Sequence, residues 1–277
     1  MIARVFPRKT VATPNDEYCF FDQPPLIGLP EGIEEVHVSV AFTYDMKVAE
    51  FLEKQWRCLG VPVKMGGPAF NEKGGEFEPG KYLKQGYVIT SRGCPNHCWF
   101  CKVPQREQGL RELEIKDGWN ILDDNILACS EQHIRSVFEM LKRQKDKPVF
   151  TGGLESKILK PWHCDLLREA KTNRMYFAYD TPDDLEPLVA AGKMLIEAGF
   201  SSKSHSLGCY VLIGYRGDTF EKAEKRLTET MLAGFMPYAM LYRDEHGKVD
   251  AIWKDFQREW LRAPIVATKM REVGKNK

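Results

Sequence analysis

The sequence predicts an α/β fold in which a parallel sheet or an open (β/α) barrel follows a short βαβ extension and precedes a C-terminal helix. The main observation is that strand-like segments alternate with helix-like segments between residues 87 and 242. The second observation is composition, because 43% hydrophobic and 29% charged residues are typical of a globular chain. A length of 277 residues fits one large domain, or one with a small appendage.

Residues 1–86 are expected to form an N-terminal arm and a small α/β extension. Prolines argue against a continuous helix or a central strand in the first thirty residues; they are Pro7, Pro14, Pro24, Pro25 and Pro30. A strand over 35–42, a helix over 45–59 and a strand over 61–65 then make one βαβ unit. A glycine-rich loop over 71–86 joins this unit to the rest.

Residues 87–245 are expected to contain the main alternation of strands and helices. The predicted strands cover 87–90, 119–122, 148–151, 175–179, 208–213 and 236–242. The predicted helices cover 131–143, 162–170, 185–198 and 219–233. Sites in such folds lie at the carboxyl ends of the strands, so the residues that follow each strand are the candidates for function.

Residues 246–277 are expected to form a C-terminal helix and a solvated basic tail. Trp253, Phe256 and Trp260 recur at helical spacing. This stripe favours packing against the core, and the alternative is a stacking platform for bases or partners.

Charge and hydropathy narrow the classes of function. Forty basic against 39 acidic side chains give a net charge of +1, so no overall field attracts nucleic acid, although a local basic patch stays open. No stretch approaches the roughly 18–20 apolar residues that cross a bilayer, and the first residues lack the apolar run of a signal peptide. We therefore expect a cytoplasmic protein without a membrane partner.

Three of the eight cysteines cluster as Cys94, Cys98 and Cys101, directly after a predicted strand. A tetrahedral zinc site needs four ligands. The natural fourth ligand is His97, but it lies inside the same loop, where its neighbours already constrain it. Iron–sulfur cubes are normally held by four cysteines, so three would leave one iron open, which implies catalysis. The other cysteines, at positions 19, 58, 129, 164 and 209, are scattered and predict no second cluster. A non-catalytic zinc or iron–sulfur module is the alternative.

The spacing Cys-x3-Cys-x2-Cys, with Phe100 before the third cysteine, resembles the signature loop of the radical S-adenosylmethionine (SAM) superfamily. The resemblance implies a partial (β/α)6 barrel over 87–245 and a [4Fe–4S] cluster held by Cys94, Cys98 and Cys101. It implies that SAM is the second cofactor and that a reductant such as flavodoxin or ferredoxin is a partner. The implied reaction is reductive cleavage of SAM to a 5′-deoxyadenosyl radical, which abstracts a hydrogen atom.

The resemblance also implies contacts to the SAM amino group. The family's Gly-Gly-Glu motif resembles Gly152, Gly153 and Glu155, although an extra leucine precedes the acid. Asp123 and Asp124 follow the preceding strand and compete for the same role. The alternatives are a helix-capping turn for the aspartates and a tight turn for the glycines.

By the same resemblance, later strand ends contact the nucleoside. Asp180 is the candidate for the SAM ribose, with helix capping as its alternative. Ile213 and Gly214 are the candidates for the adenine.

The N-terminal βαβ unit resembles a remnant of the Rossmann-like domain in cobalamin-type relatives. The Asp-x-His-x-x-Gly cobalamin signature does not occur in the chain, so cobalamin is not expected. The resemblance leaves the substrate and the reaction on it open, since the radical-forming parts serve many reactions. A nucleic-acid-modifying activity is the alternative to a reaction on a small metabolite or a peptide.

Overall fold

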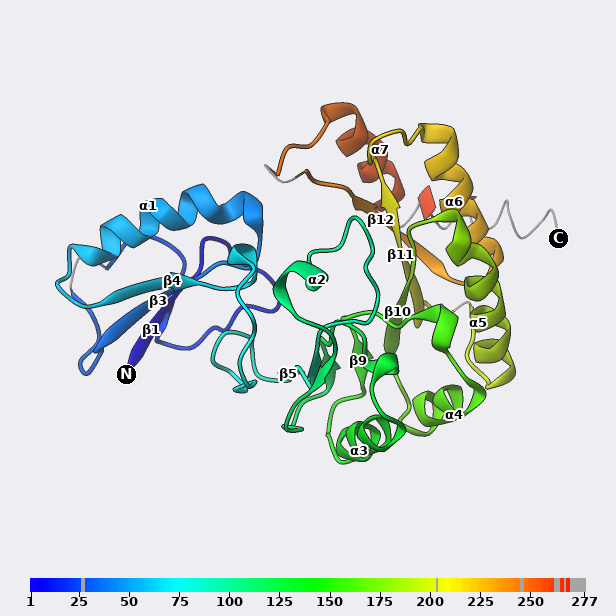
Figure 1. The fold of residues 1–277 in the computed structure, drawn as a ribbon, viewed down its shortest axis with the longest axis horizontal. Coiled ribbons are helices and arrows are strands. Elements are labelled where there is room, and N and C mark those ends of the chain that lie inside the picture. The colour runs from blue at the N-terminus through cyan, green and yellow to red at the C-terminus, as the bar shows by residue number, and fades with distance from the viewer. Residues whose placement is uncertain (26–27, 203, 245–246, 262–264, 267, 270–277) are drawn as a thin grey trace.

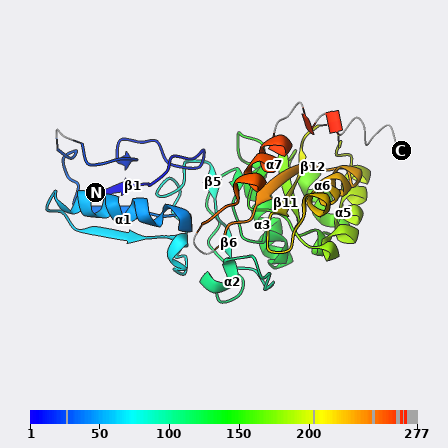
Figure 2. The ribbon, with the colours of Figure 1, turned by 90° about the horizontal axis from the view of Figure 1, so that it is seen from above.

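The computed structural model describes residues 1–277 apart from 26–27, 203, 245–246, 262–264, 267 and 270–277. Within the described residues, the strands form two parallel sheets and one antiparallel pair. Figures 1 and 2 show two lobes side by side, the N-terminal sheet with its helix in one and the larger sheet with most of the helices in the other. The predicted α/β class with parallel pairing is therefore confirmed.

The N-terminal sheet has the strand order β2-β1-β3-β4. Its strands are β1 (Ile2–Val5), β2 (Cys19–Phe20), β3 (Glu35–Ser39) and β4 (Val63–Gly66). Helix α1 (Met46–Arg57) turns Leu52 and Trp56 onto one face of the sheet, where they pack with Val36 and Val38 in a small separate core.

The expectation that the first thirty residues hold no central strand is wrong. Strand β1 lies between β2 and β3 and pairs with both. The physical reason is position: β1 ends at Val5, before Pro7, so no proline removes a donor from its ladder. Four residues are too few for a period-2 pattern to stand out in the sequence.

The larger sheet has the order β12-β11-β10-β9-β8-β5, so each strand neighbours the next one along the chain. Its strands are β5 (Tyr87–Val88), β8 (Asn120–Ile121), β9 (Val149–Phe150), β10 (Arg174–Tyr179), β11 (Leu207–Ile213) and β12 (Met236–Leu241). All five pairings are parallel, which brings the carboxyl ends of the strands to one edge. The first three strands are two residues long, whereas the sequence predicts four residues for each.

Helices alternate with these strands as predicted. They are α3 (Glu131–Lys142), α4 (Pro161–Glu169), α5 (Leu185–Glu197) and α6 (Phe220–Leu232), and Figure 1 shows them following one another along the outer side of the sheet. Short 3-10 turns occur at η1 (Thr43–Asp45), η2 (Pro68–Phe70), η3 (Ile126–Ala128), η4 (Ser156–Ile158) and η5 (Pro182–Asp184).

The two faces of the larger sheet differ in burial. On β11, Cys209, Val211 and Ile213 are fully buried in the main core, whereas Tyr210 and Leu212 on the other face are half-buried. Tyr210 stacks on Tyr176 of β10, with ring centroids 4.7 Å apart, and Tyr238 of β12 meets Tyr176 edge-on at 5.2 Å. The face away from the helices therefore carries an aromatic layer across three strands.

Two further elements complete the fold. Strands β6 (Ser91–Arg92) and β7 (Arg111–Glu112) pair antiparallel. Between them lie the cysteine loop, which is residues 93–102, and the short helix α2 (Val103–Arg106). Helix α7 (Ala251–Leu261) confirms the predicted C-terminal helix. Its Trp260 is buried and belongs to the main core, as the packing interpretation of the aromatic stripe expects.

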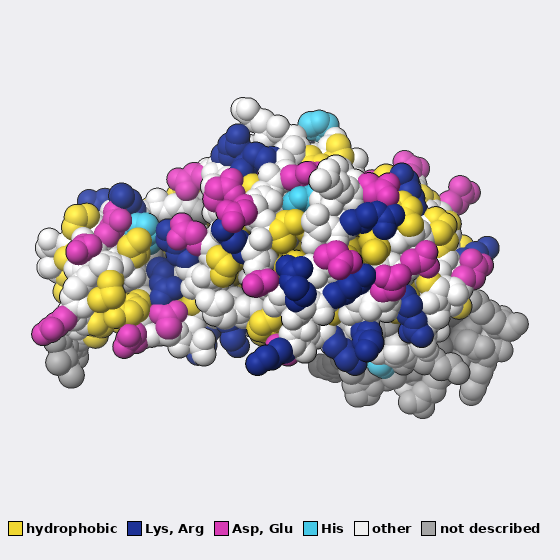
Figure 3. All heavy atoms as spheres, turned by 90° about the horizontal axis from the view of Figure 1, so that it is seen from below, with side chains coloured by type: hydrophobic (Ala, Val, Ile, Leu, Met, Phe, Trp, Pro, Cys, Tyr) yellow, Lys and Arg dark blue, Asp and Glu magenta, His cyan; other side chains and the backbone are white. Residues whose placement is uncertain are grey.

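Within the described ranges, no helix has the length and apolar character needed to cross a bilayer. Figure 3 shows Lys and Arg side chains interspersed with Asp and Glu over the face drawn there. That face therefore carries no large patch of one charge sign.

Candidate functional site

The three clustered cysteines lie on one loop between β6 and α2, and all three are free thiols. Cys94 and Cys101 are half-buried, and Cys98 is exposed. Burial raises the pKa of the Cys98 thiol, and the neighbouring Cys101 and Cys94 raise it further. In the part of the chain that the structure describes, no three His, Cys, Asp or Glu side chains surround a single metal-ion position.

Nitrogen donors face two of these sulfurs. The backbone N–H of Asn96 lies 3.5 Å from Cys94 Sγ, and the backbone N–H of Val103 lies 3.4 Å from Cys101 Sγ. Asn125 Nδ2 lies 3.4 Å from Cys94 Sγ. Such N–H groups stabilise the thiolate form, which is the form that binds metal and iron–sulfur clusters. The donor set therefore fits an iron–sulfur cluster.

Gly93 shapes the start of the cysteine loop. Its φ of 87° lies in the left-handed region, and a Cβ at this position would be 1.9 Å from the carbonyl oxygen of Gly109. Its N–H donates to Asp124 Oδ2 at 2.8 Å. Glycine is therefore required both by the backbone conformation and by the close approach of the returning chain.

Asp123 is buried and ties the end of β5 to the end of β8. Its carboxylate accepts from the Thr90 N–H at 2.6 Å, from Thr90 Oγ1 at 2.6 Å and from Ser91 Oγ at 2.7 Å. Burial raises the pKa of this carboxyl above its ordinary value, although the bonds from Thr90 and Ser91 act in the opposite direction. Asp123 is thus hydrogen-bonded to the two residues, Thr90 and Ser91, that shortly precede the cysteine loop.

Asp124 is engaged by the loop itself. Besides the Gly93 N–H, Asp124 accepts from Arg106 of α2, whose Nη2 lies 2.9 Å from Asp124 Oδ1. The helix-capping alternative for the two aspartates is wrong, because the side chain that caps α3 is Ser130, which accepts from the His133 N–H. Neither aspartate is held as a cap, and both support the turn that carries the cysteines.

The residues of the Gly-Gly-Leu-Glu segment follow β9. A Cβ on Gly152 would lie 2.1 Å from the Asp123 carbonyl oxygen, so the glycine lets β9 approach β8 closely. Gly153 has a φ of 90°. Leu154, the extra residue in the motif, is buried in the main core, and Glu155 accepts a bond from Asn125 Nδ2 at 2.6 Å. The side chain of the extra leucine is therefore buried in the core, and the Glu155 carboxylate still points toward the cysteine loop.

Asp180 lies at the carboxyl end of β10. Its Oδ1 accepts from the Leu212 N–H of β11 at 3.1 Å. Burial, and then the charge of Asp184, raise the pKa of Asp180 to about 7. The capping alternative is wrong here too, since the first turn of η5 is capped by Thr181 and Asp184. The charge of Asp180 also raises the pKa of the Cys98 thiol.

Ile213 and Gly214 end β11. The Ile213 side chain is fully buried in the main core, and its backbone carbonyl accepts from the Tyr242 N–H at 2.8 Å. Gly214 has a φ of 73°, and a Cβ there would lie 2.9 Å from Leu241 and 3.0 Å from Trp253 of α7. Gly214 therefore allows α7 to pack closely beside the strand end.

The cysteine loop reaches across to the opposite edge of the sheet. Trp99 is 59% exposed, and its ring centroid lies 5.5 Å from that of Tyr215 and 5.7 Å from that of Tyr242. These tyrosines follow β11 and β12, whereas the loop itself follows β5 and β6. The loop consequently spans the carboxyl edge of the six-stranded sheet.

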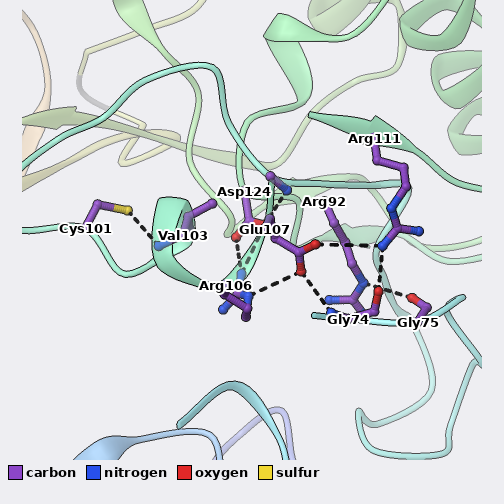
Figure 4. A network of polar contacts seen from close by, with 10 residues as sticks. Gly74, Gly75, Arg92, Cys101, Val103, Arg106, Glu107, Arg111 and Asp124 are labelled. Atoms are coloured by element: carbon purple, nitrogen blue, oxygen red, sulfur yellow. Dashed lines mark hydrogen bonds and ion pairs between the residues drawn. The ribbon is translucent and has the colours of Figure 1, made fainter. Parts of the chain in front are cut away.

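A network of charged groups holds the loop that precedes β5 against the cysteine loop, as Figure 4 shows. Glu107 is buried; it accepts from the Gly74 N–H at 3.0 Å and pairs with Arg106 Nε at 3.4 Å. Arg111 donates to the Gly74 carbonyl at 2.6 Å, and Arg92 donates to the Gly75 carbonyl at 3.1 Å.

The sequence analysis did not identify this network or Asn125. The Gly74-Gly75 pair was a signal for the close approach of another chain segment. Asn125 directly follows Asp124 at a strand end, where side chains of functional interest are expected. Those positions could have been found, but not their partners, which lie about thirty residues away in the sequence.

Comparison with known proteins gives a partial similarity. No protein-family model matches the chain. Ribosomal protein uS12 methylthiotransferase RimO of Actinobacillus succinogenes is 29% identical over 148 residues, which are 49% of this chain and 33% of the relative. The same enzyme from Actinobacillus pleuropneumoniae serotype 5b is 29% identical over 119 residues, 39% of this chain and 27% of the relative.

The similarity supports the radical SAM superfamily. It agrees with the resemblance that the cysteine spacing carries. The matched part is about a third or less of the length of these relatives, so it does not extend to their whole activity. The likeness of the N-terminal unit to cobalamin-type relatives stays a prediction.

Proposed function

We propose that this chain is a radical SAM enzyme whose [4Fe–4S] cluster is held by Cys94, Cys98 and Cys101. The observation that carries the proposal is that three thiols share one loop at the carboxyl edge of a parallel sheet, with N–H donors on two of them. When bound, such a cluster supplies the electron that cleaves SAM into methionine and a 5′-deoxyadenosyl radical. A three-cysteine set leaves one iron free for SAM.

The SAM contacts follow from the strand ends. Glu155 is the proposed partner of the SAM ammonium, because its carboxylate is held beside Cys94 through Asn125. Gly152 and Gly153 permit the close backbone approach at this point. Asp123 and Asp124 lie at the same edge, and we propose that they position the loop, since their oxygens already accept bonds from it.

The nucleoside is proposed to lie farther along the same edge. Asp180 Oδ1 is used by Leu212, so the ribose hydroxyls would meet the rest of this carboxyl group. Gly214 and the backbone of Ile213 are the proposed adenine contacts. Trp99, Tyr215 and Tyr242 bring three aromatic rings together at this edge, and a radical intermediate requires a site from which water is excluded.

The electron must come from a partner, for which a flavodoxin or a ferredoxin is the proposed class. Cys98 and Trp99 are exposed, so the loop that carries the cluster is accessible from outside. The similarity covers only about a third of the methylthiotransferase, so it does not specify the substrate of this chain. Nucleic acid therefore stays an alternative substrate class beside a small metabolite or a peptide.

Anaerobic reconstitution with iron and sulfide tests the proposal. About four irons per chain and SAM-dependent release of 5′-deoxyadenosine after reduction are expected. Cys94→Ala, Cys98→Ala or Cys101→Ala should each abolish both, whereas Cys58→Ala, an exposed cysteine on the N-terminal unit, should leave both unchanged. One zinc per chain without SAM cleavage would instead support the non-catalytic module.

A further inference from the structure

Asn125 joins the cysteine loop to the segment after β9. It is 4% exposed, and its Nδ2 lies 3.4 Å from Cys94 Sγ and 2.6 Å from Glu155 Oε2. Cys94 precedes Asn125 by 31 residues and Glu155 follows it by 30, so one side chain brings together two distant parts of the sequence.

The chemistry of the two neighbours determines how the amide is oriented. A side-chain amide has two N–H donors on nitrogen and an acceptor on oxygen, whereas a carboxylate and a cysteine sulfur that ligates a cluster accept only. The nitrogen must therefore face Cys94 and Glu155, with one N–H available for each. Asn125 Oδ1 is buried and has no hydrogen-bond partner among the described residues, which is unfavourable for a polar atom.

Local backbone structure does not explain the asparagine. Asn125 precedes η3, where asparagine commonly caps the first turn, yet its side chain makes no capping bond there. The side chain is instead turned toward Cys94 and Glu155. Its buried position is thus used for these two contacts.

We propose that Asn125 is a positioning residue that sets the electron-donor strength of Cys94 and fixes Glu155 beside it. This inference rests on the proposed function. An N–H bond to a cluster cysteine withdraws charge from the sulfur and raises the reduction potential of the cluster. The second N–H holds the carboxylate that would receive the SAM ammonium. One amide thereby links electron transfer to SAM placement.

The test compares Asn125→Ala with wild type in an anaerobic redox titration followed by electron paramagnetic resonance. Loss of the N–H bond should lower the reduced-to-oxidised ratio of the cluster about tenfold at fixed potential, a shift of about 59 mV for a one-electron couple. The affinity for SAM, measured as the change in the same spectrum, should also fall about tenfold. Asn120→Ala is the matched control, since Asn120 lies on β8, five residues before Asn125, and accepts instead from Thr151 Oγ1 at 2.6 Å.

An unchanged potential in Asn125→Ala, with four irons bound, would overturn the inference while leaving the proposed function intact. Failure of wild type to assemble a cluster would instead contradict the proposed function itself. If Asn125→Ala does not retain the cluster, Asn125→Asp is measured, because it is isosteric and lacks both N–H donors. The potential of Asn125→Asp should be lower than that of wild type, and an equal or higher value would refute the role of Asn125.

Discussion

Trp99 packs edge-on against Tyr215, and their ring centroids are 5.5 Å apart. The first residue belongs to the cysteine loop and the second follows β11, so the contact closes the loop over the carboxyl edge of the sheet. Aromatic pairs of this kind contribute about 0.5–1.5 kcal/mol beyond the area that they bury.

Removing this contact is expected to expose the proposed cluster rather than to prevent its assembly. Trp99→Ala should bind the same iron as wild type, but lose it several-fold faster in air, because water and oxygen reach the loop. Iron content and the visible spectrum followed over time measure the effect. Trp99→Phe keeps an aromatic ring and should lie close to wild type; equal decay of all three proteins would show that Trp99 does not shield the site.

Gly93 and Gly109 form a matched pair for testing the start of the loop. Both have positive φ, 87° and 85°, but a Cβ would clash only at Gly93. Gly109→Ala should cost about 1 kcal/mol of backbone strain and retain iron. Gly93→Ala adds a steric conflict with the Gly109 carbonyl and should lose most of the iron. Urea unfolding with iron analysis separates the two, and identical behaviour would contradict the steric argument.

Patterns within single segments predicted most of the fold. The apolar runs of β10 and β11 and the amphipathic α3 and α6 were visible because each extends over six residues or more. Strand β1 was missed because it is short and is stabilised by neighbours on both sides, which no local pattern shows.

The candidate site was likewise predicted only where its residues lie close together in the sequence. The cysteine spacing is local, and so the three thiols were found in the sequence. The roles of Asp123, Asp124 and Asn125 depend on contacts with residues 18 to 33 positions away, such as Thr90, Arg106 and Glu155. Sequence reasoning placed the two aspartates at a strand end, but it could not tell a carboxylate that binds the loop from one that caps a helix.

Asp123 provides a stability test of that distinction. Asp123→Ala leaves the Thr90 N–H, the Thr90 hydroxyl and the Ser91 hydroxyl without their acceptor. Since each unpaired buried group costs about 1–3 kcal/mol, the free energy of unfolding should fall by about 3 kcal/mol or more. Asp123→Asn keeps one acceptor and should be milder. Asp146→Ala, an exposed site, should change stability by about 0.5 kcal/mol or less, and a similarly small effect of Asp123→Ala would refute the tethering role.

Asp180 predicts a pH dependence of stability with a definite sign. Its pKa is raised from 3.8 to about 7 in the folded protein, chiefly because burial disfavours the charged carboxylate. The folded state therefore holds the proton more tightly than the unfolded state. The stability that this contributes is complete below about pH 4 and is lost as the pH rises through 7.

Asp180→Asn removes the ionisable group but keeps an oxygen that can accept from the Leu212 N–H. At pH 8 the variant should be more stable than wild type by up to about 4 kcal/mol, because wild type then buries a charge. Near pH 4 the two proteins should differ little, since Asp180 is protonated in folded wild type. Urea unfolding at the two pH values measures this, with Asp183→Asn as an exposed neighbouring control. A difference that does not change with pH would show that Asp180 is already charged in the folded protein.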